Sequence, residues 1–302
     1  MKIILQKHIS TYYLFISRST SMKRKQAFSY ASGPILYNMT NDYMFRYILQ
    51  ENESILKAFL ASLLHLNEHS ISSIEILNPI FLGDTVDQKN FLLDIRLKLN
   101  DNQLINLEMQ VINRGDWTDR SLSYICRQYD SLNKGDNYTE ALSVRHIGII
   151  DFNLFEDDTE FYSTYYIKND KTGRIYNSKF IISVLNLKQI NNATEEDRSY
   201  NINTWASLFK AGTWEELKMI ADNSKNDVFK DTAQKIYNAN NYDAVLERCQ
   251  ARQDYIYWEN RAKYRYKKIE EENTELKQYN SELLEQNKQL IAEIAKLKSG
   301  VK

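Results

Sequence analysis

The sequence predicts an α/β domain that is followed by a helical extension and a C-terminal coiled coil. Apolar residues repeat at helical spacing between residues 40 and 64, and they alternate with polar residues between 91 and 111. From residue 269 onward they recur every seven residues, as they do in a coiled coil. The length of 302 residues allows one or two compact domains and such an appendage.

The composition is that of a soluble globular protein, with 43% hydrophobic and 26% charged residues. Cys126 and Cys249 are too few and too distant for a disulfide framework or a zinc site, which favours a reducing, cytoplasmic setting. The sequence contains no run of about 18 apolar residues, so it predicts no membrane span. Because the net charge is -1, binding of nucleic acid must rely on local patches. The phosphate loop G-x-x-x-x-G-K-S/T is absent, so no nucleotide cofactor is expected.

Residues 1–35 are expected to form a basic, disordered N-terminal extension. The first 41 residues contain no Asp or Glu, whereas their basic residues are Lys2, Lys7, Arg18, Lys23, Arg24 and Lys25. Two alternatives remain open: a basic arm that touches phosphates, and a translation start at Met22 or Met39. A secretory signal fits poorly, because Lys7 and His8 interrupt the apolar stretch after Lys2.

Helices and strands then alternate up to residue 187. Thr40 or Asn41 is a good N-cap for a first helix, and a second helix follows Asn52. A third is capped by Asp116 or Thr118 and runs to Tyr129. Strands are expected at 73–76, 145–151, 161–167 and 180–185, with a hairpin at 91–111. We therefore assign residues 36–187 to the α/β core.

Beyond residue 187 the chain is polar and helical. The segment 213–216 matches a capping box, in which Glu216 returns a bond to the cap residue Thr213. From about Tyr255 no Gly or Pro occurs until Gly300, which predicts one long helix. We therefore expect a helical extension at 188–254 and a coiled coil at 255–302.

The hairpin carries the candidate chemistry. Odd-numbered residues are apolar at 91–99 and at 105–111, while Asp94, Glu108 and Gln110 share the even-numbered face. A three-residue loop at 100–102 pairs Leu99 with Gln103, and the same register places Asp94 opposite Glu108. Cross-strand Cβ atoms are roughly 4.5–5.5 Å apart, so the two carboxylates repel each other unless a cation lies between them.

Two interpretations of this pair compete. On an arbitrary hairpin, two such carboxylates usually decorate a solvated face. Leu92 and Leu104 lie on the same face, which indicates that it is partly covered and that bare carboxylates there are costly. This favours a site for a hard divalent cation such as magnesium, manganese or calcium.

Asp94, a turn and then Glu108-Met109-Gln110 resemble the D…(D/E)xK signature of the PD-(D/E)XK nuclease superfamily. More closely, the chain resembles the recombination-promoting nuclease and transposase (Rpn) family over roughly residues 36–250. The matching segments are 40–46, 78–79, 91–95, 104–110, 120–127 and 146–152. The resemblance implies a restriction-endonuclease-like core, with a mixed sheet flanked by helices. It also implies a metal-dependent endonuclease that acts on DNA in recombination, transposition or mobile-element biology.

Carried over residue by residue, the resemblance makes Asp94 and Glu108 the catalytic metal ligands, with the backbone carbonyl of Met109 completing the set. Mg²⁺ is the expected ion, with Mn²⁺ or Ca²⁺ as alternatives. Gln110 stands where the superfamily usually has lysine, although close relatives tolerate glutamine. A neutral amide can orient a water molecule but supplies no charge, so this departure puts the role of a lysine ammonium in doubt.

Four further residues have two interpretations each. Asp42 is either an additional acid near the metal or a first-turn residue stabilised by the helix dipole. Arg120, Tyr124 and Arg127 follow an i, i+4, i+7 spacing and therefore share one helix face. They either contact DNA phosphates beside the scissile bond or are ordinary surface residues.

The C-terminal helix predicts self-association. Leucine or isoleucine occupies every d position and asparagine most a positions, which is typical of a parallel dimer with a fixed register. Leu284 and Ile291 at e positions leave higher order open, and one amphipathic helix on its own domain is the alternative. The a and d residues are Ile269, Asn273, Leu276, Asn280, Leu283, Asn287, Leu290, Ile294 and Leu297.

We therefore expect a metal-dependent DNA endonuclease that associates through its coiled coil. The rival is a catalytically inactive DNA-binding or assembly protein, for which Gln110 is the best argument. An RNA-directed nuclease would use the same site, and the sequence does not separate it from a DNA enzyme.

Overall fold

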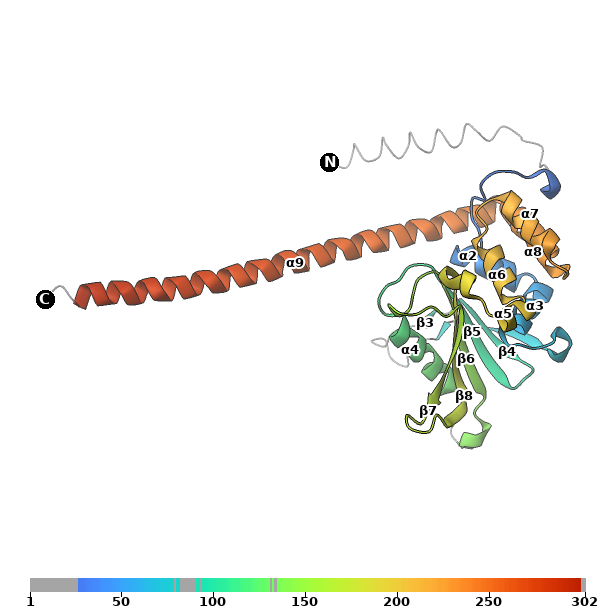
Figure 1. The fold of residues 1–302 in the computed structure, drawn as a ribbon, viewed down its shortest axis with the longest axis horizontal. Coiled ribbons are helices and arrows are strands. Elements are labelled where there is room, and N and C mark those ends of the chain that lie inside the picture. The colour runs from blue at the N-terminus through green and yellow to red at the C-terminus, as the bar shows by residue number, and fades with distance from the viewer. Residues whose placement is uncertain are drawn as a thin grey trace. The chain divides into compact units, whose positions relative to one another are not determined.

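The computed structural model describes residues 27–78, 80–81, 91–92, 94–130, 132 and 135–299. Residues 1–26, with the predicted basic arm, lie outside these ranges, as does Leu93 of the hairpin. The centre is a six-stranded mixed sheet in the order β1-β4-β5-β6-β8-β7, drawn in Figure 1. Its strands are β1 (Ile74–Leu77), β4 (Ile95–Leu99), β5 (Gln103–Gln110), β6 (Ser143–Ile150), β7 (Tyr162–Lys168) and β8 (Ile175–Asn186). A separate antiparallel pair joins β2 (Ile80–Phe81) to β3 (Phe91–Leu92).

Strands β5, β6 and β8 are parallel neighbours, and β1, β4 and β7 are paired antiparallel at the two sides. The predicted fold class, a mixed sheet flanked by helices, is therefore confirmed. The hairpin register is also as predicted, since Leu99 pairs with Gln103 and Ile95 with Leu107. Asn100 and Asp101 adopt left-handed φ angles of 48° and 59° in the loop, which Asn and Asp tolerate better than most residues.

Helices cover both faces of the sheet. The elements are α2 (Asp42–Gln50), α3 (Glu53–Leu63), α4 (Trp117–Tyr129), α5 (Glu195–Ser199), α6 (Ile202–Lys210), α7 (Trp214–Asn223) and α8 (Val228–Ala239). Asn41 caps α2 by accepting from the backbone N–H groups of Tyr43 and Met44. Thr213 and Glu216 form the predicted capping box of α7.

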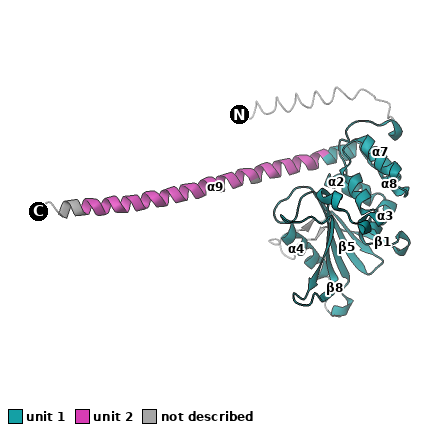
Figure 2. Cartoon of the chain, in the orientation of Figure 1, with its two compact units in different colours: residues 1–249 teal, residues 250–302 magenta. Residues whose placement is uncertain are grey.

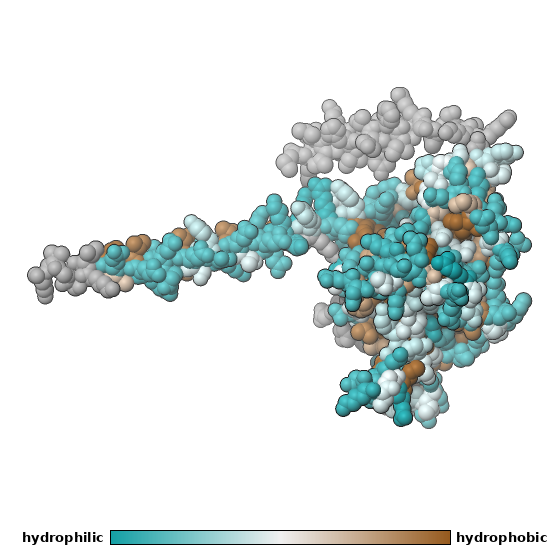
Figure 3. Space-filling view, in the orientation of Figure 1, coloured by the Kyte–Doolittle hydropathy of each residue, from teal (hydrophilic) through white to brown (hydrophobic). Residues whose placement is uncertain are grey.

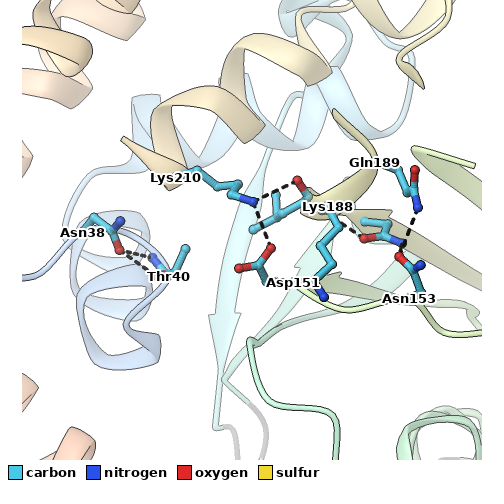
Figure 4. A network of polar contacts seen from close by, with 9 residues as sticks. Asn38, Thr40, Asp151, Asn153, Lys188, Gln189 and Lys210 are labelled. Carbon is cyan, nitrogen blue, oxygen red and sulfur yellow. Dashed lines mark hydrogen bonds and ion pairs between the residues drawn. The ribbon is translucent and has the colours of Figure 1, made fainter. Parts of the chain in front are cut away.

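The odd-numbered apolar side chains of β4 and β5 join the larger core, which they share with α2, α3 and α6 to α8. Phe59 of α3 lies with its ring centroid 5.3 Å from that of Trp205 and 5.0 Å from that of Phe209, both on α6. Lys210, at the end of α6, also binds Asp151 at 3.1 Å, beyond the end of β6 (Figure 4). The helices that follow residue 187 thus pack into the core of the sheet domain, so the expected boundary at 187/188 is not a boundary in the packing.

The even-numbered face is covered by α4. Leu104 and Val144 form a small cluster with Ile125 of α4. Trp117, at the start of α4, packs with Ile150 and other residues further along the same face. As the sequence indicated, this face is covered, and the side chains of Asn106, Glu108 and Gln110 on it are buried.

The helix α9 (Asp243–Ser299) is continuous, as the absence of Gly and Pro predicts. One compact unit ends at Cys249 and a second begins at Gln250 (Figure 2). In the second unit the apolar residues at the predicted a and d positions from Ile269 to Ile294 are exposed on the single chain. The side chain of Leu297 lies outside the described part. None of the helices in the described ranges is long and apolar enough to cross a bilayer.

Candidate active site

The two predicted carboxylates lie at the end of the sheet where the parallel strands β5 and β6 finish. Glu108 is on β5, two residues before the strand ends, and Asp94 immediately precedes β4. Asp94 Oδ2 accepts a hydrogen bond of 2.8 Å from the backbone N–H of Met109. This bond fixes the Asp94 carboxylate beside the residue that follows Glu108.

Both carboxyl groups are held in an environment that disfavours their charge. Burial raises the pKa of Asp94 to about 7, and the negative charges of Glu108 and then Asp42 add to the effect. The bond from Met109 and the positive charge of Arg46 act in the opposite direction. Asp42, buried in the first turn of α2, therefore contributes to the field at this site.

Glu108 is 8% exposed, and burial raises its pKa although a cation lies beside it. Arg120 Nη2 of α4 is 2.8 Å from Glu108 Oε1. The other oxygen, Oε2, is 3.5 Å from His146 Nε2 and makes no hydrogen bond. One oxygen of Glu108 is therefore neutralised by an arginine, and the other is a buried acceptor that is not satisfied.

His146 of β6 is fully buried next to Glu108. Burial and then the charge of Arg120 lower its pKa to about 3, so its imidazole is neutral at physiological pH. Its Nδ1 lies 2.7 Å from Nδ2 of Asn106, which is also fully buried. When the Asn106 amide donates to Nδ1, the proton resides on Nε2, and that N–H faces the free oxygen of Glu108.

The helix α4 brings two of its three predicted phosphate-binding residues to Glu108. Burial and the charge of Glu108 raise the pKa of Tyr124 to about 12, and the Arg120 guanidinium lies 5.9 Å from the Tyr124 ring centroid. Arg127 is half-buried and lies about 10 Å further along the helix than Arg120, by the helical rise alone. Arg120 and Tyr124 thus face the sheet rather than solvent.

A glycine lets α4 approach strand β6 closely. Gly148 of β6 pairs with Glu108 of β5, and a Cβ atom there would be 2.2 Å from Cζ2 of Trp117. Only a residue without a side chain lets the Trp117 ring lie on the strand at this point. Gly148 therefore helps to set the height of α4, and of Arg120 on it, above the carboxylates.

Gln110 is buried on the same strand face, two residues beyond Glu108. Its Nε2 donates a hydrogen bond of 2.8 Å to the carbonyl of Ile112, while its Oε1 makes none. The NH₂ group is thus held by the backbone, and the carbonyl oxygen is the end of the amide that is left to interact with a water molecule or a substrate.

The donor set suits a hard divalent cation. Asp94 and Glu108 offer only oxygen atoms, and a positive charge between them would offset the burial that raises both pKa values. It would also offset the charge of Glu108, which raises the pKa of Asp94 further. The buried oxygen Oε2 of Glu108 also needs a partner. Within the described part of the chain, however, no three side chains of His, Cys, Asp or Glu converge as a ready-made metal site. A cation therefore fits two side chains and depends on backbone or water oxygens for the rest.

Sequence reasoning missed three contributors: Asn106, His146 and Gly148. Each lies on the even-numbered face, and the burial of a polar pair at 106 and 146 follows from the parallel pairing of β5 with β6. A glycine inside an apolar strand was the available signal, because it marks a close approach.

A family model described as "PD-(D/E)XK nuclease family transposase" matches residues 39–267. A search of curated proteins gave no match, and neither did a search of solved structures. The matched range contains the whole sheet, all the residues of the site and the first part of α9.

Proposed function

Because this chain belongs to the PD-(D/E)XK nuclease family of transposases, we propose that it is a metal-dependent endonuclease that hydrolyses phosphodiester bonds in DNA, in recombination, transposition or another process of mobile elements. The observation that carries the proposal is the juxtaposition of Asp94 and Glu108, two carboxylates with raised pKa values at the same end of the sheet. Clusters of this kind are typical of functional sites.

Asp94, Glu108 and the backbone carbonyl of Met109 would hold the cation, with Mg²⁺ as the expected ion and Asp42 as an additional acid nearby. When bound, such a cation supplies Lewis-acid polarisation of the phosphoryl group and a water molecule of lowered pKa. His146 and Asn106 would orient Glu108 from below, as hydrogen-bonding partners of ligand carboxylates commonly do.

In this proposal Arg120 binds either Glu108 or an oxygen of the attacked phosphate. It pairs with Glu108 at 2.8 Å and with its side chain 16% exposed. A cation on Glu108 would release the guanidinium, which is then placed to bind an oxygen of the attacked phosphate. Tyr124, against the Arg120 guanidinium, would guide this movement, and Arg127 would contact the DNA backbone further along α4. Gln110 would orient the attacking water through Oε1.

The rival function, an inactive DNA-binding or assembly protein, is favoured by one observation. Gln110 replaces the usual lysine, and its NH₂ group is occupied by the Ile112 carbonyl. Both functions are compatible with a parallel dimer formed through α9, for which the exposed apolar residues of that helix are the support.

Cleavage of supercoiled plasmid, with magnesium, manganese, calcium or a chelator, separates the two functions. The wild-type protein should nick or linearise the plasmid in a divalent cation, whereas Asp94→Ala and Glu108→Ala should not. Asp101→Asn is the matched control, because Asp101 is an exposed carboxylate on the same hairpin and asparagine tolerates its left-handed φ of 59°. Wild-type protein that never cuts DNA or RNA in any of these ions would support the rival. Folded Asp94→Ala that cuts at the wild-type rate would refute the site assignment.

A further inference from the structure

The first part of the second unit carries an unusual surface. Between Tyr257 and Lys268 the sequence contains five Lys or Arg residues, one acidic residue and four aromatic residues, but no Leu, Ile, Val, Phe or Met. At 100° per residue, six side chains fall within an arc of about 120° on the helix. We call this surface the aromatic–basic stripe: Tyr257, Trp258, Arg261, Tyr264, Arg265 and Lys268.

The aromatic rings of the stripe are open to solvent. Trp258 is 60% and Tyr264 is 72% exposed. By contrast, Trp117, Trp205 and Trp214 are all buried. Leaving large aromatic surfaces in water costs free energy, so a cluster of them indicates contact with another molecule.

Arginine is already arranged against these rings. The Arg261 guanidinium lies 5.5 Å from the Trp258 ring centroid, and its Nη1 donates to the hydroxyl of Tyr257 at 3.4 Å. The Tyr257 and Trp258 ring centroids are 5.3 Å apart. Lys268 makes an exposed i, i+4 pair with Glu272 at 3.6 Å, which is worth little and is easily exchanged for another anion. The stripe therefore offers flat π surfaces and cations side by side.

A second copy of the chain does not account for the stripe. With Leu276 and Ile269 at d positions, the same heptad places Tyr257 and Tyr264 at f, Arg261 and Lys268 at c, and Trp258 and Arg265 at g. None of the six occupies the a or d seam. In Figure 3 the hydrophobic colour on α9 gathers toward its C-terminal end, beyond this segment. A membrane surface is also a poor fit, because interfacial helices need a face of aliphatic residues.

We propose that the aromatic–basic stripe binds single-stranded nucleic acid, with bases stacked on Tyr257, Trp258 and Tyr264 and phosphates paired with Arg261, Arg265 and Lys268. Proteins that bind single strands without sequence preference combine exposed aromatic residues, on which bases stack, with cations that pair with the phosphates. That this single strand is DNA rests on the proposed nuclease function. The site lies entirely in the second unit and is distinct from the carboxylates of the sheet.

Fluorescence anisotropy with a labelled 20-nucleotide oligothymidylate tests this on the full-length protein. The measurement is made in a chelator, so that binding does not depend on cleavage. Tyr257→Ala/Trp258→Ala/Tyr264→Ala should weaken binding at least tenfold, since one lost stacked base alone costs about fivefold or more. Tyr279→Ala is the matched control, because Tyr279 is 58% exposed on the same helix and lies outside the stripe. It should bind as the wild type does.

Two further readouts separate a binding role from a structural one. Arg261→Gln/Arg265→Gln should lower the slope of log K against log salt by about 1.4, from two lost phosphate contacts on a single strand. Trp258→Phe should retain binding where Trp258→Ala loses it, because a phenyl ring still stacks. Circular dichroism and light scattering should show the wild-type helix content and mass for every variant.

The proposal is overturned if the triple variant binds oligothymidylate as tightly as the wild type. It is equally overturned if the full chain prefers a duplex of the same length, or if it binds only vesicles of anionic phospholipid. A protein that binds the single strand through the stripe but never cleaves DNA in any divalent cation would contradict only the proposed nuclease function.

Discussion

Replacing Asp94 by asparagine should make the metal-free protein more stable at pH 8 and should leave its stability almost unchanged at pH 4. Asparagine has nearly the shape of aspartate, and its Oδ1 can still accept the hydrogen bond from Met109 that is seen at 2.8 Å. It cannot ionise, so it removes the charge that burial and Glu108 oppose.

The magnitude follows from the pKa. A rise from 3.8 in the unfolded chain to about 7 in the folded protein corresponds to about 4 kcal/mol. Because Asp94 keeps part of its surface in contact with water, we take half of this, about 2 kcal/mol. The sign is fixed by linkage: the folded state binds the proton more tightly, so stability is lost as the pH rises from 3.8 to about 7. The gain in the variant should appear over that window and stay constant above it.

Urea denaturation in a chelator between pH 4 and pH 8.5, followed by the fluorescence of the buried tryptophans, measures this difference. Asp101→Asn, on the exposed loop of the same hairpin, should show no such pH-dependent gain. Millimolar Mg²⁺ should stabilise the wild type and not Asp94→Asn, if Asp94 binds the ion. A variant that gains nothing between pH 4 and pH 8 would refute the electrostatic account of the site.

Three other changes have defined outcomes. Gly148→Ala should lower the free energy of unfolding by about 1–3 kcal/mol and reduce cleavage, because its Cβ displaces Trp117 and the helix that carries Arg120. The control in urea denaturation is Gly212→Ala, where the atom nearest to the added Cβ is 3.7 Å away. Equal losses of stability in the two variants would contradict the packing argument. Gln110→Lys should keep or raise the rate of plasmid cleavage by restoring a cation beside the attacked phosphate, and complete inactivity of a folded variant would show that the amide has another role. Isoleucine at Asn273, Asn280 and Asn287 should strengthen self-association and shift it toward trimers, as measured by sedimentation equilibrium; a monomeric variant would rule out the predicted seam.

The hairpin was predictable because its period and its loop leave one register. Apolar residues at the odd positions 95–99 and 105–109, together with a three-residue turn, placed Leu99 opposite Gln103. The same register predicted that Asp94 lies near Glu108, whose charge acts on it in the structure. The long C-terminal helix was equally accessible, since no helix breaker interrupts it. In both cases the information is local, and short segments of sequence contain all of it.

The surroundings of Glu108 depend on contacts between distant segments. The spacing of Arg120, Tyr124 and Arg127 showed a shared helix face but not that Arg120 turns inward, which depends on how Trp117 packs on Gly148. His146 meets Asn106 only because β6 pairs in parallel with β5 at this register. Likewise, the polar composition after residue 187 concealed that Trp205 packs against Phe59 in the core of the sheet domain.

The ion pair between Arg120 and Glu108 makes cation binding and anion binding interdependent. A cation on Glu108 and the Arg120 guanidinium at 2.8 Å are like charges that neutralise the same carboxylate, so each weakens the binding of the other. A phosphate that draws Arg120 away lowers this competition and tightens the ion. By thermodynamic reciprocity, the ion tightens the phosphate by the same factor. In the proposed enzyme, the site is therefore fully assembled only when nucleic acid and cation are present together. Either one alone must overcome the attraction between Arg120 and Glu108.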